Sequence, residues 1–416
     1  MVASGEAPRW RQLTMADVMA EFYDGPHATP PPANEGPVYL GIRNISEDGR
    51  LDLSDIRHID ESDYPKWVSR VEPRAGDLVF TYEATLHRYA ILPDGFRGSL
   101  GRRIALIRVD PDVVDRRFLH YVFLSPQWRR TIEQRLNIGS TVDRIPLTEF
   151  PNYPIAVPPL DYQREVVHAL GAIDDLIENN RRRIEILEET ARLIYREWFV
   201  HFRFPGHEGV ELVDSDGGSI PEGWCTETLA DAAHLVMGQS PKSEFYNDDG
   251  VGLPFHQGVT NFASRYPEHK KWCTEANRIA EQGDVLLSVR APVGRINVAP
   301  DRLVIGRGLA ALRTRRGSQV HLFETLREVF AEEDSMGGGT IFKAVTKTDL
   351  ERIIVLRPPA DLVSLFDASV GPMFELVQNL TFQNRVLSQA RGLLLPRLIS
   401  GDVYVSDLDL DLEPVA

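Results

Sequence analysis

The stretch ENNRRRIEILEETARLIYREWF (residues 178–199) decides the fold, because it places a long amphipathic helix almost midway along a chain of 416 residues. Apolar residues recur there at alternating steps of four and three, the spacing of a coiled-coil seam. The centre of this seam consists of Ile173, Ile177, Asn180, Ile184 and Leu187. A domain linker would be expected at mid-chain, so we interpret the helix itself as a structural spacer.

A second helix of the same kind follows 200 residues later, where VLRPPADLVSLF (355–366) repeats the pattern of IAVPPLDYQREV (155–166). The centre of its seam consists of Val377, Leu380, Asn384 and Leu387. One asparagine interrupts each seam, and a buried polar residue of this kind fixes register at some cost in stability. Pro372 is expected to break or kink the first turns of this helix. Two stripes at one period favour an antiparallel pair over two surface helices that each pack on their own domain.

The duplication extends beyond the helices, since GDL (76–78) matches GDV (283–285) and IPLTEF (145–150) matches VTKTDL (345–350). Each copy begins with short β-branched runs and Gly/Pro/Asn turns, which predict a compact mixed α/β domain. The predicted fold class is therefore α+β, a tandem duplication of two mixed α/β domains and two long antiparallel helices that form a coiled coil. The expected segments are a first domain (1–157), a central helix (158–204), a second domain (205–357), a distal helix (358–400) and an acidic tail (401–416).

Charge is unevenly distributed along the chain, whose net charge is −15. Residues 283–316 hold seven arginines against two aspartates, and residues 97–108 hold four arginines and no acid. Phosphate binding needs local positive charge, so these two stretches keep nucleic acid possible as a partner of an acidic protein. Cys225 and Cys273 are the only cysteines, too few for a disulfide framework. With no apolar signal segment or membrane-length run, we expect a cytoplasmic protein without a membrane partner.

The order of domain, Pro-Pro, long helix, repeated twice, resembles the DNA-specificity subunit of type I restriction-modification enzymes. GDVLLSVRAPVGRINVA (283–299), IGRGLAALR (305–313), VPPLDYQREVV (157–167) and LIYREWFVHF (193–202) carry this resemblance, which covers nearly the whole chain. The resemblance implies two target-recognition domains that each read one half of a split, asymmetric DNA site, with the helices setting the gap. It also implies a chain without catalytic activity that recruits two methyltransferase subunits, which use S-adenosylmethionine, and motor-nuclease subunits, which use ATP and Mg.

Known motifs for chemistry are absent from the sequence: we find no GK[ST] P-loop, no strand-linked GxGxxG and no HExxH. We therefore expect no catalytic residue and no bound cofactor or metal in this chain. Three alternatives stay open: a coiled-coil scaffold that does not bind DNA, a stand-alone nuclease or methyltransferase, and a specificity subunit of a related defence system with another effector.

Candidate DNA contacts come from loops in both domains, because loops or helix ends must face one groove. Arginines beside glycines and amides able to pair with adenine are the candidates in the second domain: Gln239, Lys242, Gln257, Arg290, Arg295 and Arg307. A basic cluster and an aromatic residue for stacking or hydrogen bonding are the candidates in the first: Tyr82, Arg97, Arg102 and Arg103. Solvated side chains at strand ends and turns are the alternative. Because Glu83 stands in the first copy near the position of Ala291, the two domains are expected to read different half-sites.

Overall fold

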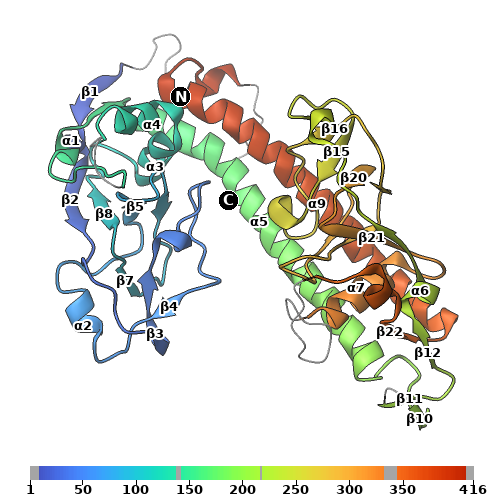
Figure 1. The fold of residues 1–416 in the computed structure, drawn as a ribbon. Helices are drawn as coiled ribbons and strands as arrows, with labels where there is room; N and C mark the ends of the chain where they lie inside the picture. Colours follow the sequence, from blue (N-terminus) through green and yellow to red (C-terminus); the bar gives the residue numbers. More distant parts are fainter. Residues whose placement is uncertain (1–8, 137–141, 216–217, 332–343, 409–416) are drawn as a thin grey trace. The chain divides into compact units, whose positions relative to one another are not determined.

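The computed structural model describes residues 9–136, 142–215, 218–331 and 344–408. The chain forms two compact units, unit 1 from residues 1–179 and 383–416, and unit 2 from residues 180–382 (Figure 1). The glycine cluster at 337–339 and the last eight residues of the acidic tail lie outside the described residues. Each unit combines short sheets with helices, so the predicted mixed α/β content is confirmed.

Unit 1 is built around an antiparallel sheet in the order β2-β8-β5-β6 and a smaller sheet in the order β4-β3-β7, in which β3 and β7 are parallel. All four residues of β5, three apolar and one threonine, are buried, so both faces of this strand are covered. The strands are β1 (Arg11–Thr14), β2 (Met19–Asp24), β3 (Ala33–Leu40), β4 (Arg57–His58), β5 (Leu78–Thr81), β6 (Tyr89–Ile91), β7 (Gly98–Leu100), β8 (Ile104–Val109) and β9 (Pro154–Val157). The helices are α1 (Met15–Val18), α2 (Tyr64–Trp67), α3 (Arg116–Leu124) and α4 (Pro126–Glu133).

Unit 2 repeats this plan with sheets in the orders β13-β21-β18-β19 and β14-β16-β15-β20-β17. Its parallel pair, β15 with β20, corresponds to β3 with β7. The strands are β10 (Leu212–Ser215), β11 (Gly218–Pro221), β12 (Cys225–Thr228), β13 (Ala233–Met237), β14 (Tyr246–Asn247), β15 (Leu253–His256), β16 (Trp272–Cys273), β17 (Ile279–Ala280), β18 (Val285–Ser288), β19 (Ile296–Val298), β20 (Leu303–Ile305), β21 (Leu309–Thr314) and β22 (Ile354–Arg357). The helices are α6 (Leu229–Ala232), α7 (Gln319–Val329) and α8 (Lys347–Glu351).

A buried aspartate occupies the same place in both copies. Arg108 Nε lies 3.0 Å from Asp77 Oδ1, and Arg313 Nε lies 2.6 Å from Asp284 Oδ1. Each aspartate also accepts a backbone N–H from three residues earlier. Because the carboxylates and guanidiniums are paired in the same way, the repeat found in the sequence extends to the interior of both sheets.

The long helices are α5 (Leu160–Tyr195), continued by a π-helical turn (Arg196–Val200), and α9 (Ala360–Ser400). Within each unit they lie side by side and run antiparallel (Figure 1). In unit 1, Val166 packs with Leu398, and the Asn384 side-chain amide donates to the Ile177 carbonyl at 3.3 Å. In unit 2, Ile184 packs with residues 377–380. The predicted seam is therefore the buried face of both helices.

Pro372 does not break the second helix, because α9 is continuous from Ala360 to Ser400. This corrects the expectation of an interrupted first segment. A proline inside a helix loses a backbone hydrogen bond and costs about 3 kcal/mol. Phe366 and Val370 before it and Val377 after it are buried, so packing on both sides of the proline offsets that cost.

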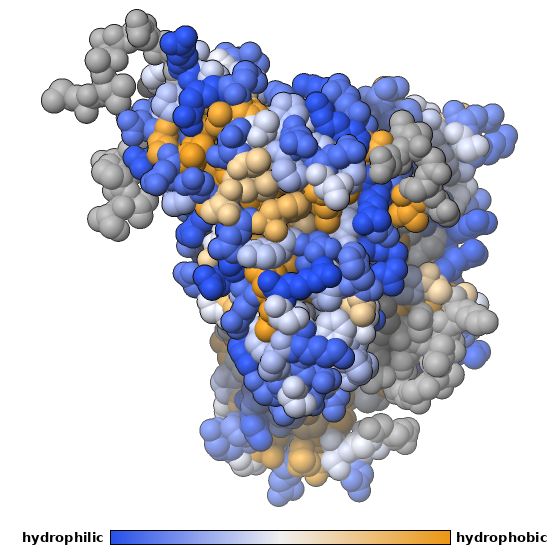
Figure 2. All heavy atoms as spheres, turned by 90° about the vertical axis from the view of Figure 1, so that its left-hand side faces the viewer, coloured by the Kyte–Doolittle hydropathy of each residue, from blue (hydrophilic) through white to orange (hydrophobic). Residues whose placement is uncertain are grey.

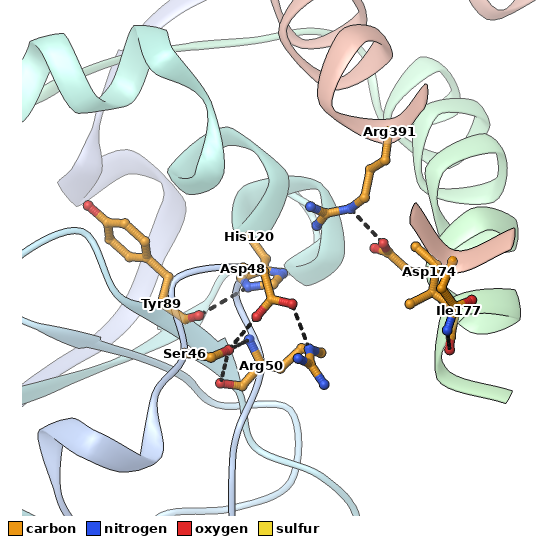
Figure 3. Close-up of polar contacts among 9 residues, drawn as sticks. Ser46, Asp48, Arg50, Tyr89, His120, Asp174, Ile177 and Arg391 are labelled. Carbon is orange, nitrogen blue, oxygen red and sulfur yellow. Dashed lines mark hydrogen bonds and ion pairs between the residues drawn. The ribbon is translucent and has the colours of Figure 1, made fainter. Parts of the chain in front are cut away.

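Polar side-chain contacts join the globular portion of each unit to the helices of the same unit. In unit 1, Arg391 of α9 lies 2.6 Å from Asp174 of α5 (Figure 3). The Tyr121 hydroxyl of α3 donates to the same carboxylate at 2.8 Å. In unit 2, Arg265 Nε donates to Glu188 Oε1 of α5 at 2.8 Å. These contacts hold a sheet domain and a helix pair together as one body within each unit.

The surface seen in Figure 2 is mostly hydrophilic, with an apolar band across its upper part. Across the described ranges, none of the helices is both long enough and apolar enough to cross a membrane.

Candidate nucleic-acid interface

Three loops of unit 2 come together at one edge of the domain, where β13, β15 and β20 end. The Gln239 N–H donates to the Ile305 carbonyl at 3.0 Å. The Ser240 hydroxyl donates to Gln257 Oε1 at 2.8 Å, and the Arg307 N–H donates to Ser240 Oγ at 3.3 Å. Gln239, Gln257 and Arg307 are exposed. The structure thus brings together three of the six residues predicted for the second domain.

Two glycines make this convergence possible. A Cβ on Gly306 would lie 2.7 Å from Gln257 Oε1, and a Cβ on Gly308 would lie 2.6 Å from the Gln257 carbonyl oxygen. The Gly308 N–H donates to that carbonyl at 3.1 Å. The close backbone approach that these glycines allow is therefore made by Gln257 of the same chain.

Arg290 lies beside the same edge. It follows Val289, whose N–H donates to the Gly308 carbonyl at 2.9 Å, and its own side chain is exposed. Among the residues that the structure describes, no carboxylate forms an ion pair with Arg290 or Arg307. The edge therefore presents two uncompensated positive charges to solvent, as phosphate binding requires.

Arg295 and Lys242 are exposed but are placed differently. The Arg295 N–H donates to Ser288 Oγ at 2.8 Å, which puts this arginine on the far side of the Pro-Gly turn from Arg290. Lys242 Nζ lies 3.6 Å from Glu244 Oε1, so part of its charge is compensated. Both residues remain predicted DNA contacts beside this edge of unit 2.

A chain of polar side chains supports the Gln257 loop from below. His256, the preceding residue, is 1% exposed, and its Nε2 lies 2.9 Å from His269 Nδ1. His269 Nε2 lies 3.3 Å from Asp301 Oδ2. Burial lowers the pKa of His256 to about 4, so this imidazole is neutral at physiological pH. His256 is thus a neutral interior residue that supports the loop carrying Gln257.

Unit 1 contains the same edge with different charges. The Tyr82 N–H donates to the Arg103 carbonyl at 3.1 Å, the counterpart of the bond beside Arg290 in unit 2. The next residue, Glu83, therefore takes the place of Arg290. Arg103 Nε lies 3.1 Å from Glu83 Oε1, and Arg144 Nε lies 3.9 Å from Glu83 Oε2. Glu83 therefore compensates arginine charge at this edge of unit 1, whereas Arg290 adds positive charge at the same place in unit 2.

Of the arginines predicted for the first domain, Arg102 is the counterpart of Arg307, and both are exposed. Arg97 lies beyond the other end of β7, so it does not form one cluster with Arg102. The Arg97 guanidinium pairs with both oxygens of Glu61 and lies over the Tyr64 ring, 4.6 Å from its centroid. Its charge is therefore engaged within the unit.

Tyr82 does not face solvent. Its side chain is 1% exposed and packs in the core of unit 1, and burial raises the pKa of its hydroxyl. A ring in this position cannot stack on a base without opening the domain. We therefore correct the expectation that Tyr82 stacks on or hydrogen-bonds to DNA, and we remove it from the candidate surface.

Two features escaped the sequence reasoning. Ser240 carries no local signal, since its partners are 17 and 67 residues away. The equivalence of Glu83 with Arg290 depends on the sheet register, which the drifting offset between the copies hides. Both become visible only when the strand pairs are superposed.

Comparison of the sequence with known proteins finds similar chains. Residues 68–189 match the family described as type I restriction modification DNA specificity domain. Two proteins of Methanocaldococcus jannaschii are similar over almost the whole chain. The MjaX type I restriction enzyme specificity subunit is 26% identical and covers 96% of this chain and 95% of its own. The MjaIX specificity subunit is 24% identical and covers 98% and 92%.

Residues 68–189 thus match a type I restriction modification DNA specificity domain, and almost the whole chain is similar to type I restriction enzyme specificity subunits. The fold of the chain is similar to the crystal structure of a type I restriction-modification system S subunit from M. genitalium, with a TM-score of 0.57 and 14% identity. That likeness covers 95% of this chain and 98% of the other.

Proposed function

We propose that the chain is a specificity subunit that binds DNA through the loop edges of both units, each reading one half of a split site. The observation that carries the proposal is the duplicated edge, with Arg102 and Arg307 exposed at equivalent positions. The different charges at Glu83 and Arg290 support an asymmetric site, because the two edges offer different partners to DNA. The recognition domains are the segments 1–157 and 205–357.

The helical segments 158–204 and 358–400 set the gap between the half-sites. An α-helix of 36 residues is about 54 Å long at ~1.5 Å per residue, which exceeds one turn of duplex DNA at ~34–36 Å. Their continuous buried seam supports this role, since a packed helix pair resists bending better than a loop. The asparagines of the seam would fix the register of the pair.

Two equivalent apolar patches support the recruitment of two identical partner subunits. Ile186 and Leu193 lie one heptad apart on α5 and are 66% and 53% exposed. Val386 and Leu393, exactly 200 residues later on α9, are 64% and 73% exposed. Exposed apolar residues that recur at repeat-related positions suit two copies of one protein. We assign them to the methyltransferase subunits, whose adenine methylation uses S-adenosylmethionine.

Catalysis belongs to the partners in this proposal, including motor-nuclease subunits that use ATP and Mg. Within the described ranges no group of three or more His, Cys, Asp or Glu side chains could hold a metal ion. The chain itself contributes binding and orientation.

Binding of fluorescent duplex DNA at two salt concentrations tests the proposal. We expect affinity to fall steeply with salt, because released counterions drive phosphate binding. The Arg102→Ala/Arg307→Ala double variant should bind more weakly and with a smaller salt slope. A protein that binds no DNA at either salt concentration would instead be a scaffold.

A further inference from the structure

Two glutamines, Gln239 and Gln257, are predicted to read bases. Within the described residues, another side chain holds only that of Gln257. The Ser240 oxygen accepts the Arg307 N–H, so its single hydrogen remains for Gln257 Oε1 at 2.8 Å. Gly306 lies against the same oxygen, since a Cβ there would be 2.7 Å from it. The carbonyl end of the amide therefore faces the protein, and the Nε2 end of this exposed residue faces solvent.

This orientation changes which base the amide can read. Bidentate pairing with adenine requires Gln257 Oε1 to accept the N6 hydrogen while Nε2 donates to N7. One lone pair of Oε1 accepts the Ser240 hydrogen, and Gly306 lies against the same oxygen and hinders access to the second lone pair, so the donor is the end of the amide offered to a base. A donor matches a base edge that carries acceptors, and guanine offers two of them, N7 and O6, in the major groove. The neighbouring Arg307 side chain is also a donor only.

Among its described residues, unit 1 has no counterpart of the Ser240–Gln257 pair. Leu40 pairs with Leu100 as His256 pairs with Ile305, so Gly41 stands at the position of Gln257 and offers no side chain. The Gly25 N–H donates to the Ile104 carbonyl as the Gly238 N–H donates to Leu309, which puts His27 at the position of Ser240. The amide reader is therefore a property of the second domain alone.

We propose that Ser240 is a positioning residue that holds Gln257 as a hydrogen-bond donor, so that the second recognition domain prefers guanine at one position of its half-site. The inference rests on the proposed function, because it presupposes that this edge faces the major groove. A glutamine that is free to rotate can offer either the donor or the acceptor of its amide to a base. Because Ser240 fixes the orientation of the Gln257 amide, only bases with an acceptor are favoured.

The test selects bound duplexes from a randomised library with the full chain assembled with its methyltransferase partners. We expect the wild type to enrich a split motif with guanine at the position that Gln257→Leu relaxes. Ser240→Ala should lower the preference for guanine over adenine at that position on the order of tenfold, because the freed Oε1 can then accept the adenine N6 hydrogen. His27→Ala, the matched change in the first domain, should leave that position unchanged.

Three outcomes would overturn the inference. If Ser240→Ala weakens binding to all sequences equally, Ser240 is merely structural. If the motif is enriched but neither Gln257→Leu nor Ser240→Ala changes any position, or if the relaxed base is adenine or cytosine, the donor assignment is wrong while the proposed function stands. If the wild type enriches no motif, the proposed function and the inference both fall. Equal melting temperatures for the variants and the wild type exclude misfolding as the cause.

Discussion

The Glu188–Arg265 pair of unit 2 makes an asymmetric prediction about stability. The Arg265 side chain is 1% exposed and Glu188 is 18% exposed. The guanidinium also packs on two rings, 3.9 Å from the centroid of Phe374 and 4.6 Å from that of Phe323. Removing either residue leaves the charged group of the other without its partner. Water can then hydrate the Glu188 carboxylate but cannot reach the Arg265 guanidinium.

Glu188→Ala should therefore cost the most. It leaves a buried guanidinium without its carboxylate, a change that costs about 3–5 kcal/mol. Arg265→Met should cost roughly 1–2 kcal/mol, because methionine refills the space between the rings and the remaining Glu188 carboxylate can hydrate. Glu61→Ala serves as the matched control, since its pair with Arg97 is exposed on both sides and is worth no more than about 1 kcal/mol.

Urea unfolding followed by hydrogen–deuterium exchange measures the loss in the unit that carries each change, with peptides from residues 180–382 for Glu188→Ala and Arg265→Met and peptides from residues 1–179 for Glu61→Ala. We expect the order Glu188→Ala, then Arg265→Met, then Glu61→Ala, from the largest loss of unfolding free energy to the smallest. Arg265→Met as the more damaging of the two changes would refute the reasoning, since it would mean that the guanidinium is not desolvated.

The remaining predictions concern binding, register, pH and assembly. Arg290→Ala should weaken specific DNA binding by roughly 1–3 kcal/mol if it contacts a base edge, or mainly lower the salt slope if it contacts phosphate; unchanged affinity and salt dependence would remove it from the interface. Asn384→Leu should raise the melting temperature while allowing other helix registers, which disulfide mapping detects; a lower melting temperature would show that the asparagine stabilises the pair. Burial raises the pKa of the Glu324 carboxyl in the folded protein. The stability that the protonated carboxyl contributes is therefore full below the pKa of Glu324 in the unfolded chain, and it is lost as pH rises through its pKa in the folded protein. Glu324→Gln should therefore stabilise unit 2 more at pH 8 than at pH 4, and an equal gain at both would contradict this assignment. Leu193→Ser and Leu393→Ser should each cost one methyltransferase subunit in native mass spectrometry, and full occupancy in the double variant would place docking elsewhere.

The helices and the duplication were predictable because both signals repeat. Seam residues such as Ile177 and Val377 recur at a fixed helical period, and the 200-residue shift superposes the two long helical segments without a gap. Periodicity of this kind survives in the fold because it determines which face is buried.

The details of the edge were not predictable, because they depend on long-range register. Nothing near Tyr82 in sequence reveals that its side chain belongs to the buried core of unit 1. Arg97 and Arg102 are neighbours in the chain but are separated by β7. The contact between Ser240 and Gln257 depends on two long-range pairings, β15 with β20 in parallel and the Gln239 N–H with the Ile305 carbonyl at the end of β20.

Genome-wide mapping of methylated adenines, in cells with and without this chain, tests the central claim most directly. Two recognition domains joined by a helix pair predict one split, asymmetric motif, with a constant gap, that is methylated only when the chain is present. A methylation pattern that is identical in both cells, or a lost motif that is continuous, would contradict the account.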